Sequence, residues 1–87
     1  MKAVKFQEPW KVACVETDMP MPGVGEALIR VKSAGICGSD IGAFRGTNLL
    51  VSYPRIIGHE IAGEIVSLPE NSPENLKIGD HVVVDPY

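Results

Sequence analysis

Turn-forming residues divide this chain of 87 residues into short segments, and their spacing limits the fold more than any other feature. Lys2–Phe6 and Trp10–Glu16 alternate apolar and polar residues, and Glu8-Pro9 separates the two stretches. A proline-rich connector, residues 17–23, follows them, and proline is excluded from central strands. These segments therefore predict two short strands and an irregular link rather than helices.

The stretch Glu26–Ala34 alternates most regularly. Ile29 and Val31 fall on one face and Arg30 and Lys32 on the other, which predicts a strand with one buried and one solvated side.

The second half of the chain contains one helical segment and two further strands. Residues 39–45 can form one or two helical turns, with Ser39 or Asp40 as the N-cap. Residues 61–68 and 81–84 are expected to be strands, and a tight turn at 77–80 precedes the second. Short strands at this spacing favour a mainly β fold, a partly open β-barrel, over a βαβ arrangement.

Composition and charge exclude several classes of protein. No apolar run approaches the roughly 20 residues of a membrane helix, and no apolar segment of a signal peptide follows Lys2 and Lys5. The formal net charge is −3 and the basic residues are scattered, which disfavours nucleic-acid binding. We expect a cytoplasmic protein with no nucleic-acid or membrane partner.

The two cysteines have different surroundings. Cys14 lies in the apolar run Val12–Val15 and is expected to be a small buried residue. Cys37 lies in a glycine-flanked turn, residues 35–40, that polar side chains follow. The secretory context that would favour a disulfide is missing. Cys37 is therefore the cysteine with a candidate chemical role.

A second polar segment, Gly58-His59-Glu60, lies about twenty residues after Cys37. Cysteine, histidine and carboxylates are ligands that zinc prefers, and a catalytic zinc keeps one coordination position open. Neighbours on a regular strand point to opposite faces. His59 and Glu60 can therefore address one metal only if the backbone turns at Gly58.

Residues 39 and 40 add groups that would suit such a site. Asp40 can accept the second ring N–H of a ligating histidine, and the Ser39 hydroxyl can pass a proton from a bound alcohol. Zinc favours deprotonation of the alcohol, and the released hydride needs a nicotinamide acceptor. The residues alone do not exclude roles without a metal. A lone cysteine is more often a core residue, and a lone histidine is more often a polar residue whose hydrogen bonds are made within the protein.

Residues 35–40 and 53–66 resemble the zinc signatures of medium-chain dehydrogenases. The opening strands and residues 79–84 resemble the GroES-like domain of the same family, so we assign 1–87 to one such domain. The resemblance implies that Cys37 and His59 are catalytic zinc ligands and that Glu60 is an adjacent carboxylate that approaches or ligates the metal. It also implies that Ser39 is the proton-relay hydroxyl and Asp40 a supporting carboxylate.

The same resemblance implies an NAD(P)-dependent alcohol or polyol dehydrogenase that acts on a secondary alcohol. The cofactors would be Zn²⁺ and either NAD or NADP, and the parent enzyme would be a homo-oligomer. The chain is expected to stop before the family's structural-zinc loop and Rossmann domain, so the 87 residues alone should be inactive and should self-associate. The Cys-Gly-Ser-Asp sequence leans toward the sorbitol, threonine and sugar-acid branch.

Two residues depart from the family pattern. Gly42 stands where members of this branch often have a relay histidine, and Pro69 replaces a small glycine. Two alternatives also remain: a metal-free GroES-like interaction or chaperone module, and a zinc-free quinone reductase. Cys37 together with His59 and Glu60 favours the zinc enzyme over both, because neither alternative needs these side chains.

Overall fold

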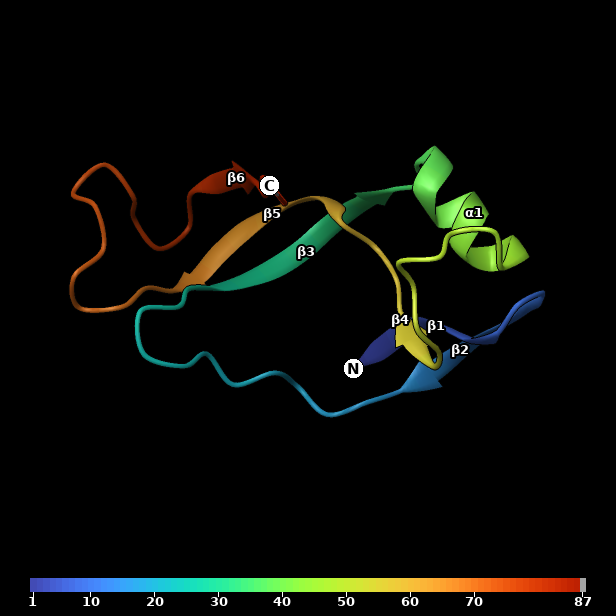
Figure 1. Ribbon diagram of the computed structural model, residues 1–87. Helices are drawn as coiled ribbons and strands as arrows, with labels where there is room; N and C mark the ends of the chain where they lie inside the picture. Colours follow the sequence, from blue (N-terminus) through green and yellow to red (C-terminus); the bar gives the residue numbers. More distant parts are fainter. Residues whose placement is uncertain (87) are drawn as a thin grey trace. The chain divides into compact units, whose positions relative to one another are not determined.

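The computed structural model describes residues 1–86, in which two three-stranded antiparallel sheets accompany one helix (Figure 1). The chain divides into two compact units. The first contains residues 1–19 and 36–58, and the second contains residues 20–35 and the segment that begins at His59. The prediction of a mainly β fold with one short helix is confirmed.

The first unit is built on a β-hairpin. Strands β1 (Lys2–Glu8) and β2 (Lys11–Glu16) pair antiparallel, with a register shift between Phe6 and Glu8, and β4 (Arg55–Ile56) pairs with the other side of β1. The hairpin matches the two predicted strands closely. The two-residue strand β4 was not predicted, because its sequence is too short to show an alternating pattern.

The helix α1 (Gly38–Arg45) packs on this hairpin through aromatic side chains. The ring of Phe44 lies 5.7 Å from that of Phe6 and 5.1 Å from that of Trp10. The Trp10 backbone N–H also donates a hydrogen bond of 2.7 Å to the Phe44 carbonyl. Phe6 and Ala43 are the buried apolar residues of this unit. With its eight residues, α1 is too short to span a membrane.

The second unit is a sheet in which β5 (Glu60–Ser67) lies between β3 (Leu28–Gly35) and β6 (His81–Val83) (Figure 1). The predicted tight turn before β6 is present, with Gly79 at a φ of 94°. Its N–H donates to the Ile65 carbonyl at 2.8 Å, and Ile65 is only 2% exposed. Ile65 therefore forms the centre of this unit's small core.

Gly63 lies where β3 and β5 approach each other most closely. A Cβ atom at this position would lie 2.3 Å from the Arg30 carbonyl oxygen and 2.7 Å from Ile29 Cγ2. A register shift between Val31 and Ser33 occurs beside this contact. The close approach therefore requires a residue without a side chain at position 63.

Two burial predictions were wrong. Val31 is 53% exposed, because the register shift next to it interrupts the simple alternation of β3. Cys14 is exposed although it lies in an apolar run. Its strand forms the edge of the sheet, and it pairs with Val4 rather than with Phe6, which the helix covers.

We predict that Gly63→Ala lowers the free energy of unfolding by about 1–3 kcal/mol, because the added methyl group collides with the backbone of β3. Gly38→Ala is the matched control, since a Cβ at Gly38 meets nothing within 4 Å. Urea denaturation of both variants tests this expectation. Equal stabilities of the two variants would contradict it.

Candidate functional site

The first group of predicted site residues lies at the N-terminus of α1. Cys37 has an extended backbone conformation and is the N-cap residue. The Asp40 N–H donates to the Cys37 carbonyl at 3.0 Å, and the Asp40 carboxylate accepts the Cys37 N–H at 3.1 Å. The predicted N-cap, Ser39 or Asp40, was therefore wrong, because the helix begins at Gly38 and Asp40 caps from its third residue.

Asp40 is unusual among the charged residues of the chain because only 7% of it is exposed. A buried carboxylate is stable only when hydrogen-bonding partners compensate for lost hydration. The bond from the Cys37 N–H supplies one such partner and fixes the backbone of the cysteine. Asp40 therefore positions Cys37 in the structure, whatever further role it has.

The Cys37 thiol lies next to a hydroxyl. Its Sγ atom is 2.7 Å from Ser39 Oγ, and either group can act as the donor. Cys37 is half-buried and Ser39 is exposed. The helix terminus thus presents a soft metal-ligating atom beside a hydroxyl that solvent can reach, as the predicted roles of both residues require.

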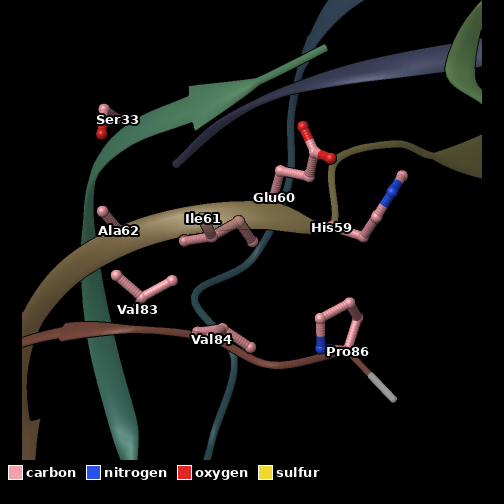
Figure 2. A pocket seen from close by; sticks show the side chains of 8 residues that line it. All are labelled: Ser33, His59, Glu60, Ile61, Ala62, Val83, Val84 and Pro86. Atoms are coloured by element: carbon pink, nitrogen blue, oxygen red, sulfur yellow. The ribbon is translucent and has the colours of Figure 1, made fainter. Parts of the chain in front are cut away.

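The second group, His59 and Glu60, lies in the second unit at the start of β5 (Figure 2). Gly58, directly before them, has a φ of 113°, which favours glycine. The backbone at Gly58 therefore departs from regular strand geometry directly before His59 and Glu60, as the sequence argument required. The Glu60 carboxylate lies against the chain at Gly35, with Oε2 3.1 Å from the position of a Cβ there.

A cavity of about 300 Å³ borders this second group. Figure 2 shows His59 and Glu60 at one side, and Ala62, Val83 and Val84 contribute apolar surface. The sequence did not identify these apolar residues as neighbours of a site, because an alternating strand does not reveal which face borders a polar pair. The cavity therefore has the polar side chains of His59 and Glu60 on one side and an apolar wall on the other.

Within each unit the predicted residues lie together: Cys37, Ser39 and Asp40 in the first, and His59 and Glu60 in the second. A thiol, an imidazole and carboxylates are a donor set that suits Zn²⁺. Cys37 and His59 are both half-buried. The residues therefore fit the metal chemically, and their individual roles stay predictions.

Gly42, which stands in the place of a relay histidine, has space beside it. A Cβ there would lie 3.5 Å from Thr47 Oγ1 and 3.6 Å from Asn48 Cβ, which is ordinary contact. Sterics therefore do not require glycine at position 42. Cys14 and Cys37 are not joined by a disulfide.

Residues 23–87 match the family model of the alcohol dehydrogenase GroES-like domain. The chain belongs to this family. The family predicted from the motifs at residues 35–40 and 53–66 is therefore confirmed.

Relatives of this GroES-like chain are dehydrogenases. It is 47% identical over 87 residues to L-galactonate-5-dehydrogenase of Escherichia coli K12, and 47% identical over 87 residues to a zinc-type alcohol dehydrogenase-like protein of Haemophilus influenzae. In both comparisons the whole chain is covered, and it corresponds to 25% of the relative. The chain thus spans about a quarter of the length of these relatives.

Solved structures show the same fold. A short chain alcohol dehydrogenase from Escherichia coli CFT073, crystallised with NADH, superposes with a TM-score of 0.85 at 42% identity. This match covers 99% of the chain and 24% of that protein. The 2R,3R-butanediol dehydrogenase of Bacillus subtilis gives a TM-score of 0.82 at 32% identity, over 95% of the chain and 27% of that protein.

We predict that Asp40→Ala lowers the free energy of unfolding by about 1–3 kcal/mol, because the partly buried Cys37 N–H loses its acceptor. Asp40→Asn should lower it less, since the amide oxygen can still accept this bond. Asp18→Ala removes an exposed carboxylate and is the control. Urea denaturation compares the three variants, and equal losses for Asp40→Ala and Asp18→Ala would contradict the capping role.

Proposed function

We propose that this GroES-like chain supplies part of the zinc site of an NAD(P)-dependent dehydrogenase that oxidises secondary alcohols such as polyols or sugar acids. The observation that carries the proposal is the cluster at the start of α1, where the Cys37 thiol lies 2.7 Å from the Ser39 hydroxyl and Asp40 holds the Cys37 backbone. The names of the relatives support an alcohol substrate.

Cys37 and His59 are the residues that we propose as zinc ligands, with Glu60 as a carboxylate that can approach the metal. Thiolate sulfur and imidazole nitrogen are common ligands of catalytic zinc, and the family relative described as zinc-type supports this metal. When bound, zinc supplies the Lewis-acid chemistry that makes an alcohol hydroxyl easier to deprotonate. The protein's own residues then have to hold the metal and take up that proton.

Ser39 is the group that we propose to receive the proton. Oxidation of a secondary alcohol to a ketone removes a proton from the hydroxyl and a hydride from the carbon that bears it. The Ser39 hydroxyl is exposed, so it can accept the proton while it passes its own to water. NAD or NADP supplies the hydride acceptor, and the relative crystallised with NADH supports this cofactor type.

The proposed substrate class rests on the relatives. Galactonate and 2,3-butanediol, which two of the relatives are named for, carry hydroxyl groups on carbons inside a chain, and these are secondary alcohols. A polar edge formed by His59 and Glu60 beside an apolar wall suits a small hydroxylated molecule. The homo-oligomeric, cytoplasmic parent enzyme expected from the sequence remains part of this proposal.

We predict that the 87-residue chain binds zinc weakly, because an incomplete ligand set gives an incomplete coordination shell. Cys37→Ser and His59→Ala should each raise the dissociation constant for zinc at least about tenfold. Equilibrium dialysis with metal analysis measures the affinity, and the absorption of bound Co²⁺ reports thiolate ligation directly.

Matched controls exist within the chain. Cys14→Ser removes the other cysteine, and His81→Ala removes the other histidine, so both should leave zinc affinity unchanged. If the Cys37 and His59 variants bound zinc as tightly as the wild type, the proposed ligands would be wrong. The metal-free interaction module and the quinone reductase would then become the better interpretations.

We also expect no alcohol-dependent reduction of NAD⁺ by the isolated 87 residues, because the chain spans only a quarter of its dehydrogenase relatives. A spectrophotometric assay with polyols and sugar acids tests this directly. Robust turnover by the isolated chain would overturn the expectation.

A further inference from the structure

The strand β2 forms an edge of its sheet, and its free side has a defined pattern of backbone groups. The Met1 amino group donates to the Thr17 carbonyl at 2.7 Å, and the Thr17 N–H donates to the Met1 carbonyl at 2.9 Å. In an antiparallel ladder such doubly bonded pairs recur at every second residue. The backbone groups of Ala13 and Val15 therefore face β1, and those of Val12, Cys14 and Glu16 face outward.

The edge at β2 lacks the features that usually prevent strands from pairing with other chains. Such features include charged residues within the strand, bulges and very short edge strands. The interior of β2, residues 12–15, is Val-Ala-Cys-Val, and its register against β1 is regular from Lys2 to Phe6. The register shift of this ladder lies beyond it, between Phe6 and Glu8 of β1. Only its two ends carry charges, Lys11 and Glu16.

The other edges of the described sheets are protected in these ways. Edge strand β3 contains Arg30 and Lys32 and has two register shifts. Edge strands β4 and β6 are only two and three residues long. Among the strands that the structure describes, β2 is therefore the edge best suited to accept another strand.

The side chains next to this edge are apolar and exposed. Val12 is 52% exposed and Val4 is 44% exposed, and Cys14 lies directly opposite Val4 in the hairpin. These three side chains share one face, because paired residues of a sheet point the same way. A strand added at the edge would extend this face and cover part of its apolar surface.

We propose that a second copy of this chain binds here, with β2 of each copy pairing antiparallel across a two-fold axis at Cys14. In this register Cys14 faces Cys14 of the second copy, and Val12 and Glu16 exchange hydrogen bonds with Glu16 and Val12. All outward-facing backbone groups of β2 are then paired, whereas a shift of the register by two residues leaves some of them unpaired.

Charge favours the same arrangement. An antiparallel pair places the Lys11 end of one strand beside the Glu16 end of the other, whereas a parallel pair would align like charges. No like charges lie directly opposite each other when Cys14 is at the axis, because Glu16 faces Val12 and Lys11 faces Thr17. The edge is therefore self-complementary in hydrogen bonds, side-chain type and charge.

Sedimentation analysis of the chain across a wide range of concentration, with a reductant present, tests the proposal. The wild type should show a monomer–dimer equilibrium. Cys14→Lys places two like charges at the axis and should weaken association about tenfold, and Cys14→Asp should act in the same way. Asn75→Lys adds the same charge on an exposed loop of the second unit and should leave association unchanged.

Mixing the two charged variants gives the sharpest test. Cys14→Lys and Cys14→Asp chains place opposite charges at the axis, so an equimolar mixture should associate more tightly than either variant alone. Circular dichroism checks that both variants keep the fold, which is expected because Cys14 is exposed. A monomeric wild type at every concentration, or a mixture that does not associate, would overturn the proposal.

Amide hydrogen exchange locates the contact independently of the variants. The N–H groups of Val12, Cys14 and Glu16 should become protected as the concentration of the wild type rises. Those of Ala13 and Val15 should be protected at all concentrations, because they face β1. Concentration-dependent protection on β3 or β6 instead of β2 would place the dimer contact elsewhere and overturn the proposal.

Discussion

The contact of Phe44 with Phe6 and Trp10 is the interaction on which the first unit depends. It fixes α1 on the β1–β2 hairpin, and the backbone bond from Trp10 to the Phe44 carbonyl strengthens the same contact. Because α1 is only eight residues long, it would not be stable without such packing. The orientation of Cys37, Ser39 and Asp40 at its N-terminus thus follows from three aromatic rings that take no part in the chemistry.

The second unit depends on a steric constraint instead. Gly63 allows β3 and β5 to approach each other at the register shift, and Ile65 then packs in the small core behind the turn at Gly79. Glu60 is the first residue of the same strand and His59 precedes it, so the pairing that Gly63 permits also holds Glu60 in place beside Gly35. The two units thus support their site residues by different means, an aromatic contact in one and a close backbone approach in the other.

Much of this could be predicted from the sequence. The sequence patterns identified the described strands except β4, and residues 77–80 identified the tight turn before β6. The motifs around Cys37 and His59 identified the family that residues 23–87 match. Local sequence patterns did not predict burial where it depends on which elements pack against a strand. Cys14 lies in an apolar run of sequence, yet its strand forms an edge of the sheet and its side chain is exposed. Val31 fits the two-residue alternation of a half-buried strand, yet it is exposed beside a register shift. The N-cap is Cys37 rather than Ser39 or Asp40, because the Asp40 carboxylate accepts a hydrogen bond from the Cys37 N–H. The sequence motif does not reveal this bond.

The order of strand pairing has a kinetic consequence. The hairpin joins residues that are close in sequence, whereas β3 and β5 are separated by the connection that contains α1 and β4. Contacts between nearby residues form faster, because less chain entropy is lost when the loop closes. In a newly synthesised chain the hairpin should therefore form before the second sheet. Its uncovered edge is then exposed while the rest is still unfolded, which makes this the stage at which crowded nascent chains are most prone to misassembly.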